Sequence, residues 1–187
     1  MQDLKAKLAG LLARKSYREG DFTLASGRKS DYYFDCRQTA LHPEGAYLLG
    51  RIFLDMIHGL DRPVHGVAGM TLGADPLVSA VTVVSNFHED PLPGMLVRKK
   101  AKGYGTGAYL EGTANFPAGV AVCMLEDVVT TGGSVLLACE RVREAGYRVG
   151  AVFCVLDRNE GGSGELERHG YELRSIFSRE DIADAAG

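Results

Sequence analysis

Hydrophobic positions along the chain follow two periods, one helical and one typical of buried strands. Residues 3–19 carry Leu4, Leu8, Leu11 and Leu12 at helical spacing, which predicts an amphipathic helix. Further on, short apolar runs alternate with longer helical patterns. The expected strands cover 64–68, 95–98, 120–125, 148–156 and 171–176; the expected helices cover 43–58, 76–87 and 135–145. This alternation predicts an α/β fold with a mostly parallel sheet flanked by helices.

Residues 1–40 fall outside that alternation. Two short strand-like pieces, 22–24 and 32–34, are separated by the turn 26–29. We expect 1–40 to form a small hood over an edge of the sheet and 60–160 to form the ligand-binding core. A length of 187 residues suits one domain, 1–187, better than two.

Four polar or glycine-rich segments each follow a predicted strand, at 69–75, 98–107, 126–134 and 157–162. In open parallel sheets, ligands bind at the carboxyl ends of the strands, where such segments meet. The order of elements therefore predicts one site built from all four.

The stretch 120–134 has the most specific chemistry. Its apolar run ends in Glu126 and Asp127, and a turn of small residues then leads into a helix. Backbone N–H groups at such a turn, with the positive end of the helix dipole, suit a phosphate. The two carboxylates suit vicinal ribose hydroxyls, directly or through a divalent cation. Together these features indicate a phosphoribosyl group; the alternative is an ordinary strand-to-helix turn with a solvated acidic pair.

The segment 98–107 places four cations, Arg98, Lys99, Lys100 and Lys102, around a glycine-rich loop. A flexible loop of this kind is costly to order unless an anion binds it, and pyrophosphate is such an anion. Closure over the anion would also exclude water. The alternative is a solvated charged turn.

The net charge, the cysteine spacing and the lack of long apolar runs exclude several classes of binding partner. A net charge of −3 argues against a broad basic face for nucleic acid. The four cysteines at 36, 123, 139 and 154 lack the spacing of a zinc site. The first twenty residues lack the apolar core of a secretory signal, and no apolar run reaches membrane-spanning length. We therefore expect a reduced, cytoplasmic protein with no nucleic-acid or membrane partner.

Three of these segments resemble known motifs. The stretch 120–134 resembles the motif with which type I phosphoribosyltransferases bind 5-phosphoribosyl-1-pyrophosphate (PRPP): apolar residues, two acids, two apolar residues, Thr, then small residues with Gly. The segment 98–107 resembles the mobile catalytic loop of orotate phosphoribosyltransferases. The pattern Ser-Gly-x-x-Ser before an aromatic pair, within 22–34, resembles their hood. With Arg158, the resemblance spans nearly the whole chain.

The resemblance implies roles for individual residues. Lys102 would be catalytic, with Asp127 as the candidate proton acceptor. Arg158 would bind the orotate carboxylate, for which a guanidinium is well shaped; the alternative is a surface ion pair with Asp157 or Glu160. Either Tyr33 or Phe34 would pack on the pyrimidine, with Thr130 nearby. The implied PRPP-binding residues are Arg98, Lys99, Lys102, Tyr104, Glu126, Asp127, Val128, Val129, Thr130, Thr131, Gly132, Gly133 and Ser134.

The implied reaction is transfer of the phosphoribosyl group from PRPP to orotate in pyrimidine biosynthesis. Mg²⁺ would be held mainly through PRPP, without a direct protein ligand. The enzyme would be a homodimer in which each subunit's loop 98–107 covers the partner's site. A phosphoribosyltransferase for another nucleobase, or a PRPP-sensing regulator that binds nucleic acid, remains an alternative.

Three positions depart from the family pattern. Tyr104 stands where His is usual, and a phenol can donate a hydrogen bond but carries no positive charge. Ala25 stands where Lys is common, and Leu72-Gly73 replaces the Tyr-Lys of some members. The segment 69–75 is therefore expected to act only through its backbone.

Overall fold

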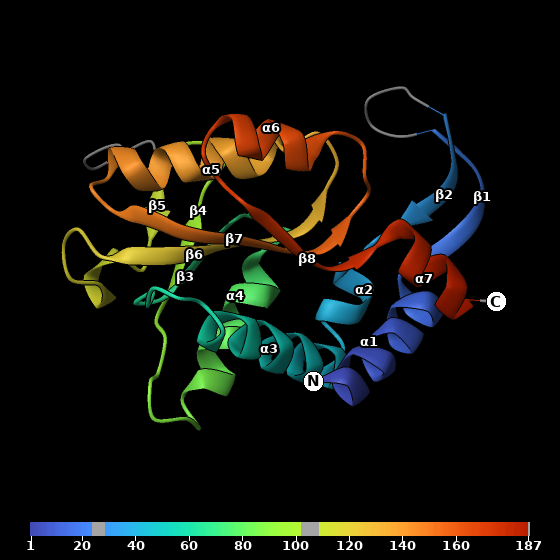
Figure 1. The fold of residues 1–187 in the computed structure, drawn as a ribbon, viewed down its shortest axis with the longest axis horizontal. Coiled ribbons are helices and arrows are strands. Elements are labelled where there is room, and N and C mark those ends of the chain that lie inside the picture. The colour runs from blue at the N-terminus through green and yellow to red at the C-terminus, as the bar shows by residue number, and fades with distance from the viewer. Residues whose placement is uncertain (24–28, 102–108, 187) are drawn as a thin grey trace.

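The computed structural model describes residues 1–23, 29–101 and 109–186 (Figure 1). The predictions for Ala25, Lys102 and Tyr104 fall outside these residues. Within them the chain forms a large six-stranded sheet and a separate two-stranded sheet. No helix in the described part of the chain combines the length and the apolar character needed to cross a bilayer.

The large sheet has the strand order β5-β4-β3-β6-β7-β8. Its strands are β3 (Val67–Met70), β4 (Gly94–Val97), β5 (Leu110–Glu111), β6 (Ala121–Val129), β7 (Arg148–Asp157) and β8 (Leu173–Ser178). Every neighbouring pair is parallel except β4–β5. The predicted mostly parallel sheet is therefore confirmed. The edge strand β5 was not predicted, because two residues are too few to show a period.

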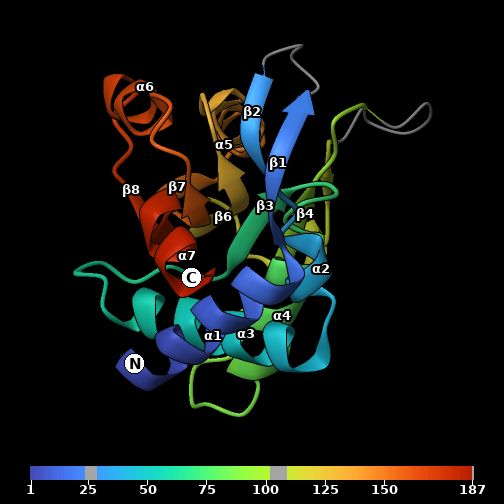
Figure 2. The ribbon, with the colours of Figure 1, turned by 90° about the vertical axis from the view of Figure 1, so that its right-hand side faces the viewer.

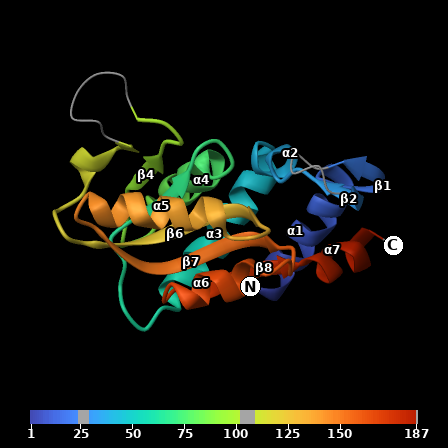
Figure 3. The same ribbon diagram turned by 90° about the horizontal axis from the view of Figure 1, so that it is seen from above.

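Helices cover both faces of this sheet (Figures 1 and 3). One face carries α3 (Pro43–His58) and α4 (Asp75–Ser85), and the other carries α5 (Gly133–Glu144) and α6 (Gly162–Arg168). The alternating side chains of β6 enter two different cores: Cys123 and Leu125 pack on the α3–α4 side, and Val122 and Met124 on the α5–α6 side. Burial on both faces explains the unbroken apolar run at 120–125.

The hood consists of an antiparallel hairpin and three helices. Its elements are α1 (Gln2–Lys15), β1 (Tyr17–Thr23), β2 (Lys29–Phe34), α2 (Arg37–Ala40) and α7 (Arg179–Ala186). Figure 2 shows the hairpin rising from the packed pair of helices α1 and α7. The hood therefore combines the N-terminal forty residues with the helix that follows β8.

The predicted helix 3–19 is wrong at its C-terminal end. The helix stops at Lys15, and Tyr17 already pairs with Phe34 in the hairpin. The hydroxyl of Ser16, at the junction, lies 2.7 Å from the hydroxyl of Thr39 in the buried interior. Tertiary pairing here overrides the local helical pattern.

Three predicted boundaries around the core also shift. Strand β6 runs to Val129, so Glu126 and Asp127 lie within the strand and not after it. Residues 162–164, predicted as loop, are the first residues of α6, which buries Leu166. The glycines at its start are poor helix formers, so the sequence pattern did not indicate this helix. Strand β3 begins at Val67 and continues to Met70, two residues into the predicted loop 69–75.

Candidate active site

A cleft of about 480 Å³ lies at the carboxyl ends of the central strands, beside the hood strand β2. Its lining residues are Tyr33, Phe34, Asp35, Cys36, Arg37, Met70, Thr71, Leu72, Gly73, Lys99, Glu126, Asp127, Val128 and Ser134. Three of the four segments expected to converge, 69–75, 98–107 and 126–134, thus contribute to one cleft. The fourth, 157–162, lies against the third without lining the cleft.

The acidic pair is partly buried. Glu126 is only 6% exposed, and within the described residues its Oε2 atom has no hydrogen-bond partner. Burial raises the pKa of Glu126 well above its usual value, and the neighbouring charge of Asp127 raises it further. Backbone N–H groups hold the pair: Asp127 N donates to Oε1 of Glu126 (3.3 Å), and Val128 N donates to Oδ1 of Asp127 (2.9 Å). A buried acceptor without a donor suits a ligand hydroxyl.

Gly73 allows the carboxylate of Asp127 to approach the turn after β3. A Cβ atom placed on Gly73 would lie 2.6 Å from Oδ1 of Asp127, well inside van der Waals contact. A larger residue at 73 would therefore displace the carboxylate of Asp127 from its present place.

The turn between β6 and α5 is compact and rests on the segment after β7. Gly132 precedes α5 with φ = 82°, a conformation that favours glycine. A Cβ atom on Gly162 would lie 2.4 Å from Cγ1 of Val129 and 2.7 Å from the carbonyl oxygen of Thr130. The backbone N–H of Arg158 also donates to the carbonyl of Val129 (3.0 Å). The segment 157–162 therefore supports the turn.

The predicted PRPP-binding residues around that turn differ in how exposed their side chains are to solvent. Val129 is buried, Thr130 is half-buried, and Thr131, Gly133 and Ser134 are exposed at the start of α5. Of these residues only Ser134 lines the cleft. The exposed positions leave the helix N-terminus open to an anion.

The described part of the cationic segment is held by α5. Lys99 lines the cleft, and its charge opposes the rise in the pKa of Glu126. Arg98 forms an ion pair with Glu111 (3.2 Å). Arg141 of α5 donates to the carbonyl oxygens of Arg98 and Lys99 and stacks 4.0 Å from the ring centroid of Tyr109. The sequence contained no signal for this contact, because it joins positions 42 and 43 residues apart.

Both members of the predicted aromatic pair line the cleft. Phe34 is buried, whereas Tyr33 is exposed and packs on Phe22 with ring centroids 5.6 Å apart. They point to opposite faces of β2, and both reach the cleft because they stand at the end of the strand.

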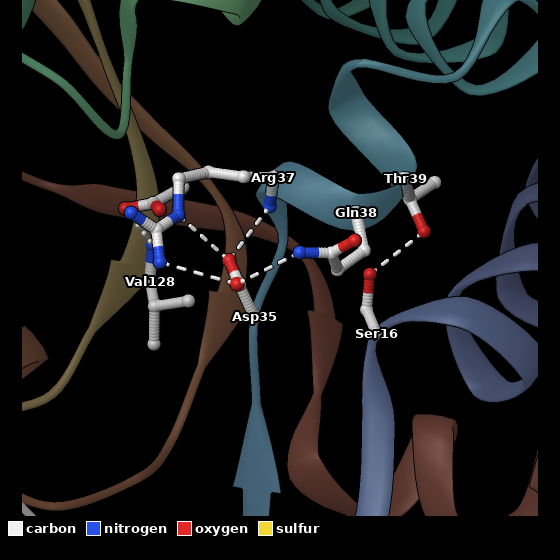
Figure 4. A network of polar contacts seen from close by, with 7 residues as sticks. Ser16, Asp35, Arg37, Gln38, Thr39 and Val128 are labelled. Carbon is white, nitrogen blue, oxygen red and sulfur yellow. Dashed lines mark hydrogen bonds and ion pairs between the residues drawn. The ribbon is translucent and has the colours of Figure 1, made fainter.

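Asp35 and Arg37 also line the cleft and were missed by sequence reasoning. Figure 4 shows the guanidinium of Arg37 bound through two contacts to Asp35, at 2.8 and 3.1 Å. This pairing holds the pKa of Asp35 below its usual value. Their position directly after the aromatic pair was the one available signal.

Arg158 lies between the central sheet and the hood. Its side chain is 9% exposed; Nε lies 2.8 Å from Oε1 of Glu160, an ion pair that lacks the alignment of a hydrogen bond. Its Nη2 donates to Oγ of Ser30 (3.4 Å), and its guanidinium stacks on Tyr32. Arg158 does not line the cleft as defined above. The alternative pairing of Arg158 with Glu160 is therefore present, with both side chains partly shielded from solvent.

Comparison with known proteins identifies the family. No family model matches the chain. The orotate phosphoribosyltransferase of Thermosynechococcus vestitus is 48% identical over 182 residues, which are 97% of this chain and 94% of that protein. The chain belongs to the orotate phosphoribosyltransferase family. The predicted resemblance is thereby confirmed.

Solved orotate phosphoribosyltransferases share the fold. The Mycobacterium tuberculosis enzyme in complex with Fe(III) dicitrate has a TM-score of 0.83 and 36% identity, covering 96% of this chain and 98% of that one. The same enzyme in complex with PRPP has a TM-score of 0.79 and 33% identity, covering 96% and 99%. The α/β architecture is therefore that of the orotate phosphoribosyltransferases.

Proposed function

We propose that this chain transfers the 5-phosphoribosyl group of PRPP to orotate, giving orotidine 5′-monophosphate and pyrophosphate in pyrimidine biosynthesis. The observation that carries the proposal is the cleft itself, which brings the acidic pair, the start of α5 and the aromatic pair of the hood together. Family membership supports the same reaction.

PRPP is assigned to the strand end and the helix start. The 5′-phosphate is placed at 130–134, where backbone N–H groups and the dipole of the twelve-residue helix α5 favour an anion. Glu126 and Asp127 accept hydrogen bonds from the ribose hydroxyls, and the unpaired Oε2 of Glu126 fits that role. Arg98, Lys99, Lys102 and Tyr104 are assigned to the pyrophosphate.

The donor chemistry of the site fits Mg²⁺ held through its substrate. Carboxylate oxygens suit Mg²⁺, and the metal commonly binds proteins through one or two of them plus substrate phosphates. Among the described residues, no group of three or more His, Cys, Asp or Glu could hold a metal. When bound to PRPP, the ion supplies positive charge to the departing pyrophosphate, while Glu126 and Asp127 hold the sugar.

Different residues of the chain then assist different parts of the reaction. As the C1–O bond breaks, its electron pair leaves with pyrophosphate, and the cations Arg98, Lys99 and Lys102 stabilise that charge. The acidic pair stabilises the positive charge that develops on the ribose. A ring nitrogen of orotate then bonds to C1, with Asp127 as the assigned proton acceptor.

Orotate is placed on the hood side of the cleft. Tyr33 and Phe34 present aromatic surface to the pyrimidine, and the family resemblance assigns Thr130 a place beside it. Arg158 supplies the guanidinium for the carboxylate that distinguishes orotate from uracil and the purines.

We further propose a homodimer seated on an apolar groove between α3 and α4. This hollow of about 1060 Å³ includes the exposed side chains of Leu41, Tyr47, Leu72, Val83 and Phe87. Leu72 and Arg37 line both this groove and the active-site cleft. A partner seated there would lie close enough to share its loop 98–107.

A cytoplasmic location without nucleic-acid or membrane partners completes the proposal. The cysteines are all free and buried, which suits a reducing compartment.

The deciding experiment follows orotate absorbance with PRPP and Mg²⁺, beside uracil, adenine, guanine and hypoxanthine. Loss of orotate alone, dependent on PRPP and metal, supports the proposal. Turnover of another base would reassign the hood and Arg158. Binding of PRPP without turnover of any base would instead favour a regulator.

A further inference from the structure

The ring of Tyr32 in β2 contacts two guanidinium groups. The Cζ atom of Arg158 is 4.4 Å from the centroid of its ring, and that of Arg179 is 4.3 Å from it. We infer that Tyr32 and Arg179 position the guanidinium of Arg158 to receive the carboxylate of the pyrimidine substrate. This inference rests on the proposed role of Arg158 in orotate binding.

The contact joins parts of the chain that are distant in sequence. Ser30 and Tyr32 occupy alternate positions of β2 and both contact Arg158, which follows the central strand β7. Arg179 is the first residue of α7. The stack therefore connects the central sheet, the hood hairpin and the helix after β8 at one aromatic ring.

Stacking fixes an arginine without using its hydrogen-bond donors. A cation–π contact engages the flat face of the guanidinium, whereas its N–H groups lie in the plane and point outward. Tyr32 is 2% exposed, so its ring has a fixed place. In the described residues, no group makes a hydrogen bond of acceptable geometry to its hydroxyl. Burial raises the pKa of the Tyr32 hydroxyl and the nearby charge of Arg158 opposes that rise, so both the ring and the hydroxyl lie close to Arg158.

Arg179 adds a second effect through Asp31. The two side chains form an ion pair of 2.6 Å, which holds the pKa of Asp31 below its usual value; the charge of Arg158 contributes in the same direction. Asp31 is therefore within electrostatic range of Arg158. By binding this carboxylate, Arg179 prevents it from competing with the substrate for Arg158.

The test compares KM for orotate and for PRPP in four variants. We expect Tyr32→Leu to raise KM for orotate about tenfold and to leave KM for PRPP within about twofold. Tyr32→Phe keeps the ring face and should stay within about twofold of the parent for both substrates. Arg179→Gln should raise KM for orotate, and Asp31→Asn added to it should restore part of the loss.

A fifth variant, Arg158→Gln, distinguishes the role of Arg158 in orotate binding from the positioning of Arg158 by Tyr32 and Arg179. If it raises KM for orotate while Tyr32→Leu and Arg179→Gln do not, the positioning inference is overturned and the role of Arg158 stands. If Arg158→Gln leaves KM for orotate unchanged, that role fails and the inference fails with it. An equal loss in Tyr32→Phe and Tyr32→Leu would assign the effect to the hydroxyl and overturn the stack. Should Tyr32→Leu not fold, Arg179→Gln and its Asp31→Asn double variant decide the question.

Discussion

At the scale of single residues, the site depends on charges held where water reaches them poorly. Glu126 is buried beside a second carboxylate, and Arg158 is half-buried beside one carboxylate and an aromatic ring. Such groups cost stability in the free protein and become useful when a ligand supplies the missing partner.

Glu126→Gln should stabilise the free protein at neutral and higher pH. The folded state raises the pKa of Glu126, so the fold binds this proton more tightly than the unfolded chain does. Stability from this group is therefore greatest below its ordinary pKa and falls as pH rises toward the raised value. Urea unfolding at pH 5 and pH 8 should show a gain for the variant on the order of 1 kcal/mol at pH 8 and less at pH 5.

The same variant should lose activity, because the carboxylate that accepts the ribose hydroxyl is gone. A stability difference that is equal at both pH values would contradict the buried ionisation argument. Asp184→Asn, on the exposed face of α7, serves as the control with no expected difference at either pH.

Arg37→Ala should raise KM for PRPP roughly tenfold, since it removes a cation at the cleft and leaves the charge of Asp35 unpaired beside the pyrophosphate. The double variant Asp35→Asn with Arg37→Ala should lose less, because it removes both charges. Steady-state kinetics with PRPP varied at saturating orotate measures both. Equal losses in the single and double variants would show that the charge of Asp35 plays no part.

At the scale of elements, the site depends on close backbone contact between the turn after β6 and the start of α6. Gly162 makes this contact possible, and Gly132 faces it from the other side. The turn after β6, the proposed phosphate site, is thus shaped partly by residues about thirty positions later in the chain.

Gly162→Ala should therefore weaken PRPP binding and lower stability, by about 1–3 kcal/mol for a clash in a packed place. Isothermal titration with PRPP and thermal unfolding measure the two effects. Gly164→Ala is the matched control: it lies in the same helix, and nothing stands within 4 Å of its added Cβ atom. Similar behaviour of the two variants would argue against the contact with Val129 and Thr130.

The sequence predicted the elements with strong local patterns. The buried strand 120–125 and the helix at Pro43 had clear patterns. The acidic pair with its small-residue turn indicated a type I phosphoribosyltransferase, and the hood pattern, the segment 98–107 and Arg158 indicated the orotate family. Arg37 had only a positional signal, and Arg141, Tyr32 and Arg179 had none that marks their contacts. The ion pair of Arg179 with Asp31 spans 148 residues, so only tertiary packing determines it.

At the scale of the whole molecule, the apolar groove between α3 and α4, at about 1060 Å³, is larger than the active-site cleft. Phe87 is 82% exposed at its rim, next to Val83. Exposure of this kind in a stable protein marks a contact surface.

Phe87→Glu should shift the protein from dimer to monomer in sedimentation velocity experiments, because it places a charge in the proposed interface. Leu137→Glu, an exposed apolar residue on α5 outside the groove, should remain dimeric. Mixing the inactive variants Lys102→Ala and Asp127→Asn should restore activity if the loop acts across subunits. A dimer that persists in Phe87→Glu would place the interface elsewhere.

The packing of α7 on α1 has a consequence for synthesis on the ribosome. Residues 1–40 leave the exit tunnel before the strands of the central sheet, whereas Arg179 and the rest of α7 leave it after them. The PRPP side of the cleft has all its strands before then, whereas the hood lacks a helix until residues 179–186 appear. The nascent chain should therefore acquire affinity for PRPP before it acquires affinity for orotate, because α7 completes the hood only after the central strands are made.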